Sequence, residues 1–125
     1  MSSDATVGIV LVSHSTALAE GAAELAAQIS GGTDDGELGT SAAKVQRAVK
    51  LADSGAGVVI LPDLGSAVLT VRALLGEAGD LPTRVELADA PFVEGVVAAT
   101  VTAAGGGDIK AVLAAAEEAR HARKL

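Results

Sequence analysis

The chain has 125 residues, a length that suits one domain, and half of them (50%) are hydrophobic. Sixteen acidic against nine basic residues give a net charge of −7, and aromatic residues are nearly absent, which argues against a nucleic-acid partner. The absence of cysteine excludes disulfides, zinc–cysteine sites and thiol chemistry, and the early apolar runs are too short for a signal sequence or a membrane span. We expect a single cytoplasmic domain over residues 1–125 that does not associate with a membrane.

The N-terminal part of the sequence predicts a strand followed by a helix. Residues 7–12 (VGIVLV) form an apolar, β-branched run typical of a strand that is buried on both faces. Apolar residues then recur at helical spacing over residues 18–29. Ser15 or Thr16 is placed to act as the N-cap of this helix.

The next segment predicts a turn, a helix and a second buried strand. Residues 30–40 contain four glycines and consist mostly of turn-forming residues. The apolar spacing after them predicts a helix that begins at Thr40 or Ser41 and ends at Gly55. Residues 58–61 (VVIL) are again typical of a buried strand.

The C-terminal half continues the alternation. The spacing of apolar residues predicts a helix over residues 68–79, a third strand over 84–88 and a fourth helix over 93–104. Asp108 is the expected N-cap of a last helix whose C-terminal turn is basic, which complements the helix dipole.

Alternating strands and helices with continuously apolar strands predict an α/β fold. We expect a doubly wound, mostly parallel sheet with helices on both faces. In such sheets ligands bind at the carboxyl ends of the strands. The candidate functional loops are therefore residues 13–16, 62–66 and 89–94.

His14 and Asp63 follow the first two strands and are the leading catalytic candidates. If these strands are adjacent, the carboxylate of Asp63 can fix the tautomer of the His14 ring and leave the other nitrogen free to attack. Two helices begin beside them, at Ser15-Thr16 and at Gly65-Ser66, and helix N-termini favour an anion such as a phosphoryl group. The structural alternatives are that His14 is an ordinary polar loop residue and that Asp63 is an N-cap.

Other chemistries fit the sequence less well. There is no Walker loop and no GxGxxG after the first strand, and Ser13 and Ser15 lack the glycine-flanked elbow of a hydrolase serine. His121, the only other histidine, lies in a basic helix end that we expect to be solvated. We expect no metal and no cofactor.

An ordered set of short motifs carries a family resemblance. They are residues 10–15 (VLVSHS), 18–21 (LAEG), 39–40 with 44–45, 63–67 (DLGSA), 90–91 with 93–95, and 98–101. Together they resemble the phosphotransfer subunits (DhaM) of bacterial dihydroxyacetone kinases, whose fold belongs to the mannose-class enzyme IIA group.

This resemblance implies a function and partners. His14 would accept a phosphoryl group from the histidine-containing phosphocarrier protein HPr of the sugar phosphotransferase system (PTS). It would pass the group to ADP on the kinase subunit DhaL. Asp63, which would orient the imidazole, and Ser66, which would stabilise the phosphoryl group, match family positions near the histidine. Thr40 matches a loop close to the same pocket.

From the placement of the two helix starts, we expect Ser13, Ser15, Thr16 and Gly65 to form a phosphoryl-binding loop, and the resemblance implies that Thr40 belongs to it. The resemblance also implies a homodimer. Apolar residues on more than one helix face, for example Val96, Val97 and Val101, favour the same state.

The sequence departs from the family between the first two helices. Family members place a second strand there, whereas the residues from Ile29 to Thr40 are mostly turn formers. We therefore expect this strand to be shortened to residues 27–30 or missing. Two alternative functions remain: a IIA domain of a mannose-class sugar transporter, and a non-catalytic regulatory domain of the same fold.

Overall fold

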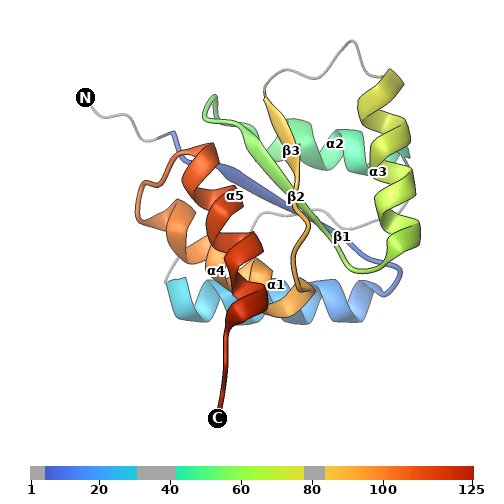
Figure 1. The fold of residues 1–125 in the computed structure, drawn as a ribbon. Coiled ribbons are helices and arrows are strands. Elements are labelled where there is room, and N and C mark those ends of the chain that lie inside the picture. The colour runs from blue at the N-terminus through green and yellow to red at the C-terminus, as the bar shows by residue number, and fades with distance from the viewer. Residues whose placement is uncertain (1–4, 31–41, 78–83) are drawn as a thin grey trace.

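The computed structural model describes residues 5–30, 42–77 and 84–125 (Figure 1). The strands are β1 (Gly8–Val12), β2 (Val58–Pro62) and β3 (Val85–Leu87). The helices are α1 (Thr16–Ser30), α2 (Ala42–Ala52), α3 (Gly65–Glu77), α4 (Phe92–Ala104) and α5 (Ile109–Glu118), and a short 3₁₀ turn, η1 (Ala119–His121), follows α5.

The three strands form one parallel sheet in the order β1-β2-β3. Val12 at the end of β1 is in register with Pro62 at the end of β2. The backbone N–H of Asp63 donates to the carbonyl of Val12 at 3.0 Å, which extends the pairing by one residue. The predicted parallel sheet is confirmed, and the loops after β1 and β2 leave it at the same edge.

Helices cover both faces of the sheet, as Figure 1 shows. Helices α2 and α3 pack on one face, where they bury Val10 and Ile60. Helices α1, α4 and α5 pack on the other, against Leu11 and Leu61. Because successive side chains of a strand point to opposite faces, an unbroken apolar run supplies both layers. The predicted doubly wound architecture is therefore confirmed.

Close packing at Gly8 leads to a prediction about stability. A Cβ atom at this position would collide with the backbone carbonyl of Ala52 in α2 and lie 2.8 Å from the Cβ of Ala52. We expect Gly8→Ala to lower the free energy of unfolding by about 1–3 kcal/mol, because β1 and α2 would have to move apart. Urea unfolding monitored by circular dichroism would measure the loss.

Gly21→Ala is the matched control for this substitution. Gly21 lies within α1, and an added Cβ would meet no atom within 4 Å. Alanine there should raise the free energy of unfolding by up to about 1 kcal/mol, since it favours the helix. Equal free energies of unfolding for Gly8→Ala and the wild type would contradict the predicted collision.

The structure rules out one of the two alternatives for the second strand and refines the bounds of other elements. Residues 27–30 are the last turn of α1 rather than a shortened strand, because the buried apolar face of the helix continues through Ala26. Helix α2 ends at Ala52 instead of Gly55, and the chain turns at Gly55 with a φ of 106°. Thr40 and the predicted start of α2 lie outside the described residues, as does the predicted helix end near Gly79.

Candidate functional site

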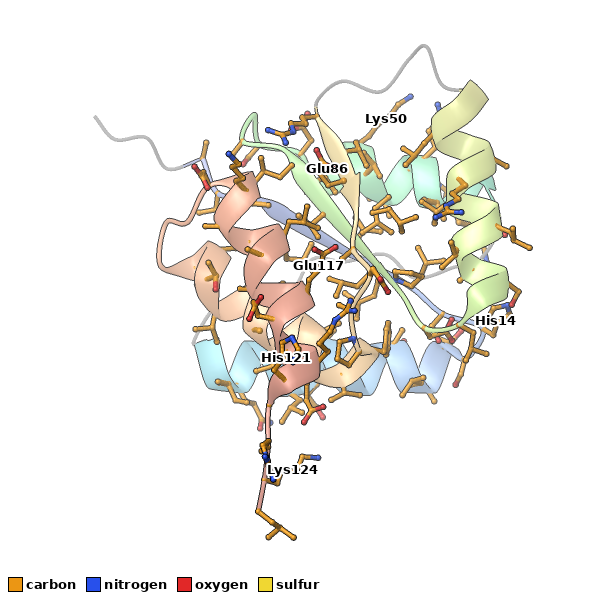
Figure 2. All side chains as sticks on the ribbon, in the orientation of Figure 1. His14, Lys50, Glu86, Glu117, His121 and Lys124 are labelled. Atoms are coloured by element: carbon orange, nitrogen blue, oxygen red, sulfur yellow. The ribbon has the colours of Figure 1, made fainter. Side chains whose placement is uncertain are left out.

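The register of β1 and β2 brings His14 and Asp63 together, as the sequence predicts. Val12 and Pro62 are paired, so the residues that follow them leave the sheet side by side. The Asp63 side chain is only 6% exposed, whereas that of His14 is 43% exposed. In Figure 2 His14 lies beside the first turn of α3, at the edge of the molecule. The pair thus combines a shielded carboxylate with an accessible ring.

Asp63 organises the loop that follows β1. Its Oδ2 atom accepts hydrogen bonds from the hydroxyl of Ser13 at 2.9 Å and from the backbone N–H of His14 at 3.0 Å. Its Oδ1 atom lies 3.2 Å from Nδ1 of the His14 ring. The backbone N–H of Ser15 donates to the Ser13 hydroxyl at 3.0 Å, which ties this serine to the start of α1. His14 is therefore held by Asp63 at two points, its ring nitrogen Nδ1 and its backbone N–H.

The pKa of Asp63 lies below its ordinary value of 3.8. Burial alone would raise this pKa, but hydrogen bonds from the His14 backbone, the Ser13 hydroxyl and the His14 ring stabilise the carboxylate and outweigh it. The carboxylate is consequently ionised at neutral pH and accepts the proton on Nδ1. This fixes the tautomer in which Nε2 carries a lone pair.

Ser66 lies at the other nitrogen of the His14 ring, Nε2. Its hydroxyl lies 2.8 Å from Nε2 of His14, on the first turn of α3. With Nδ1–H committed to Asp63, the hydroxyl donates to the Nε2 lone pair. A group that becomes bonded to Nε2 would meet the same hydroxyl, which can rotate to donate to an oxygen of that group.

Two helix starts flank the ring. The Oγ atom of Ser15 accepts from the backbone N–H of Leu18 at 3.1 Å, which makes Ser15, rather than Thr16, the N-cap of α1. Helix α3 begins at Gly65, and no acceptor among the described residues takes the backbone N–H groups of Gly65 and Ser66. Free N–H groups at a helix start favour negative charge.

The remaining sequence candidates lie elsewhere. Thr40 is outside the described residues, so its predicted place in the phosphoryl-binding loop stays a prediction. His121 is exposed in η1 and lies far from His14 in Figure 2. Within residues 5–30, 42–77 and 84–125 no three His, Asp or Glu side chains gather in a way that could hold a metal ion. None of the helices described there is long and apolar enough to cross a membrane.

A cleft beside the site was not predicted from the sequence. Its volume is about 440 Å³, and it lies between α3 and the loop that follows β3. That loop is anchored by the C-terminal end of the chain: the backbone N–H of Asp89 donates to Glu117 at 3.1 Å, and Arg120 pairs with the Asp89 carboxylate at 3.3 Å. No short motif signals such a cleft, because residues from three separate segments create it.

Comparison with known proteins assigns the chain to a family. Residues 8–113 match the family model EIIA-man, the PTS system fructose IIA component. The chain is 39% identical, over 94% of its length, to the phosphoryl donor subunit DhaM of the PEP-dependent dihydroxyacetone kinase of Escherichia coli (strain K12). It spans only 28% of the length of that protein.

Two further relatives are similar to this chain over most of their own length. The phosphoryl donor subunit DhaM of PEP-dependent dihydroxyacetone kinase 2 of Listeria innocua is 34% identical, and the match covers 76% of this chain and 84% of that protein. A crystal structure of a protein of unknown function superposes with a TM-score of 0.73 at 34% identity. That match covers 96% of this chain and 97% of the other. The matched family segment includes His14, Asp63 and Ser66.

Proposed function

Because the chain belongs to the EIIA-man family and is a relative of the DhaM phosphoryl donor subunits, we propose that it is a phosphohistidine relay for a dihydroxyacetone kinase. His14 takes a phosphoryl group from HPr and gives it to ADP bound on the kinase subunit DhaL. The single observation that carries this proposal is the ring of His14, held by Asp63 at Nδ1 and facing Ser66 at Nε2.

The first transfer forms one bond and breaks another. The Nε2 lone pair attacks the phosphorus of the phosphorylated donor in line, the new N–P bond forms, and the donor's bond to phosphorus breaks. Nδ1 keeps its proton, so the ring gains positive charge, which the Asp63 carboxylate balances. The Ser66 hydroxyl then donates to a phosphoryl oxygen, and the free N–H groups at the start of α3 favour the negative charge.

The second transfer reverses these steps. An oxygen of the terminal phosphate of ADP attacks the phosphorus, the N–P bond breaks, and ATP leaves on the partner while His14 returns to the neutral ring. Neither transfer requires a proton to move to or from the ring, because Nδ1–H remains hydrogen-bonded to Asp63 throughout. Both reactions require an in-line approach to one nitrogen, so the donor and the acceptor use overlapping surfaces and compete for the chain.

A two-step assay tests this function. The protein is first incubated with labelled phosphoenolpyruvate, enzyme I and HPr, and the loaded protein is then chased with ADP-bound DhaL or with a mannose-class IIB protein. We expect label on His14 and its transfer to ATP. Label moving to the IIB protein and not to ADP would assign the chain to a sugar transporter, and loading without release to either partner would favour the regulatory alternative.

We also propose that the chain forms a homodimer through α1 and α4. Leu18, Leu25 and Ile29 are exposed at positions i, i+7 and i+11 of α1, and the exposed Val101 lies on α4, which packs against α1. Val96, expected from the sequence to contribute, is fully buried in the monomer and takes no part. The exposed stripe is the kind of apolar surface that association covers.

Leu25→Glu should therefore turn a dimer into a 12.2 kDa monomer in sedimentation at tens of micromolar protein. Leu51→Glu is the matched control, because Leu51 is also exposed but lies on α2, on the opposite face of the sheet. This control should remain dimeric. A wild-type protein that sediments as a monomer at that concentration would refute the dimer.

A further inference from the structure

Ser13 has a buried hydroxyl that the two transfer steps do not use. Among the residues that the structure describes, Ser13 is the one buried polar residue, with 5% of its surface exposed. The side chain of His14, by contrast, is 43% exposed, and its Nε2 atom faces the exposed Ser66. A buried hydroxyl has to find hydrogen-bond partners within the protein to replace water, so the partners of Ser13 indicate its role.

The hydrogen bonds of the Ser13 hydroxyl are all made within the protein. Its single proton has two acceptors in reach, Oδ2 of Asp63 at 2.9 Å and the carbonyl of Ser15 at 3.0 Å. The carbonyl already accepts from the backbone N–H of Ala19 at 3.1 Å, and an ionised carboxylate is the stronger acceptor, so the proton goes to Asp63. The Ser13 oxygen in turn accepts from the backbone N–H of Ser15 at 3.0 Å. The hydroxyl therefore has no proton left for a phosphoryl oxygen, although the sequence places Ser13 in the phosphoryl-binding loop.

The hydroxyl of Ser13 orients the carboxylate of Asp63. Two donors meet at Oδ2, the Ser13 hydroxyl at 2.9 Å and the His14 backbone N–H at 3.0 Å. Together they fix the rotation of the carboxylate, which leaves Oδ1 facing Nδ1 of the ring at 3.2 Å. The hydrogen bond from Ser13 is also one of the causes that hold the pKa of Asp63 below its ordinary value.

We propose that Ser13 is a positioning residue for phosphoryl transfer, which acts on the His14 ring through Asp63 and does not touch the phosphoryl group. This inference rests on the proposed phosphohistidine chemistry at Nε2. Without the hydroxyl, Oδ2 keeps one of its two donors and the carboxylate can turn. The proton is then held less strictly on Nδ1, and Nε2 presents its lone pair for a smaller fraction of the time.

Ser13→Ala should slow single-turnover transfer from phosphorylated HPr about tenfold, because a hydrogen bond to a charged group is lost. Ser54→Ala is the matched control. The hydroxyl of Ser54 also ties backbone groups together, since it donates to the carbonyl of Thr6 at 2.8 Å and accepts from its N–H at 3.2 Å, but it lies near the other end of β1 and contacts no carboxylate there. Ser54→Ala should transfer at the wild-type rate. A wild-type rate for Ser13→Ala would overturn the proposal.

A double substitution separates positioning through Asp63 from direct contact with the phosphoryl group. In the Asp63→Asn protein, Ser13→Ala should cause no further slowing, because the carboxylate through which Ser13 acts is already gone. The same tenfold loss in that background would show that Ser13 acts on the phosphoryl group itself and would overturn the proposal.

Nitrogen NMR of the unphosphorylated His14 ring gives a readout that a merely structural serine would not change. We expect the proton to reside on Nδ1 in the wild type and in Ser54→Ala, and to be shared between Nδ1 and Nε2 in Ser13→Ala. An unchanged tautomer in Ser13→Ala would contradict the positioning role. If Ser13→Ala does not fold, as judged by circular dichroism, Ser13→Cys takes its place with the same expectations, because a thiol is a weak donor.

Phosphoramidate distinguishes a failure of this inference from a failure of the proposed relay. Nε2 bonds to its phosphorus as ammonia leaves, with no partner protein, so Ser13→Ala should slow this reaction by about the same factor as transfer from HPr. Equal rates with phosphoramidate for Ser13→Ala and the wild type would overturn the positioning role alone. A wild type that reacts with phosphoramidate but exchanges nothing with HPr or DhaL would overturn the relay, while slower reaction of Ser13→Ala with phosphoramidate would still support the positioning role.

Discussion

His14→Gln is expected to reduce phosphoryl uptake from phosphorylated HPr to the background of the assay. Glutamine has no nucleophilic nitrogen, because its amide lone pair is delocalised, whereas the His14 ring presents Nε2 beside Ser66 at 2.8 Å. His14 is substantially exposed, so its replacement should leave the core intact. Acid-labile phosphate after incubation with labelled phosphoenolpyruvate, enzyme I and HPr measures the uptake.

His121→Gln is the matched control for this result, because it removes the only other histidine of the chain. His121 lies in η1, far from His14 in Figure 2, so uptake should equal that of the wild type. Acid-labile phosphate that persists on His14→Gln and disappears in His121→Gln would show that His121, and not His14, is phosphorylated.

Asp63→Asn is expected to slow phosphoryl transfer by about a hundredfold while the protein remains folded. The amide carries no charge to balance the ring when Nε2 becomes bonded to phosphorus. It can also turn its NH₂ group toward Nδ1 and favour the wrong tautomer. Rapid-quench measurement of the single-turnover rate from phosphorylated HPr would give the effect. A rate within about twofold of the wild type would reduce Asp63 to a structural role.

Ser66→Ala provides a comparison at the other nitrogen. Its hydroxyl contacts Nε2 but carries no charge, so its removal should slow transfer by about tenfold, less than Asp63→Asn. A larger loss of transfer rate in Ser66→Ala than in Asp63→Asn would contradict the prediction that the Asp63 carboxylate contributes more to transfer than the Ser66 hydroxyl.

The lowered pKa of Asp63 predicts that the stability difference between the wild type and Asp63→Asn depends on pH. A carboxyl group whose pKa is lower in the folded than in the unfolded state stabilises the fold fully above its unfolded pKa, and this contribution is lost as the pH falls through the folded pKa. The free energy of unfolding of the wild type should therefore exceed that of Asp63→Asn at neutral pH, and the difference should shrink as the pH falls below about 4. Urea unfolding at several pH values would measure it.

The sequence was sufficient to predict that His14 and Asp63 meet. Both follow short apolar runs that are typical of buried parallel strands, and adjacent parallel strands end at one edge. The contact of Ser66 with Nε2 was less accessible, since it depends on how the first turn of α3 is placed against the ring. A shortened strand at residues 27–30 was expected only because the family places a strand after the first helix, whereas the helical spacing of apolar residues already reaches Ile29. The structure continues α1 to Ser30.

The cleft between α3 and the loop after β3 could not be predicted from the sequence. Arg72 lines this cleft only because α3 lies close to β3 and to the loop that Arg120 anchors. Exposed leucines such as Leu69 resemble core positions in a helical pattern until the packing of the helix is known.

Nitrogen NMR of the histidine-labelled protein, recorded after loading from phosphoenolpyruvate, enzyme I and HPr, tests the central claim most directly. It reports which histidine carries phosphorus and on which ring nitrogen. We predict one phosphohistidine, His14, with phosphorus on Nε2 and a proton retained on Nδ1. Phosphorus on Nδ1 of His14, on His121 or on a residue other than histidine would contradict the account.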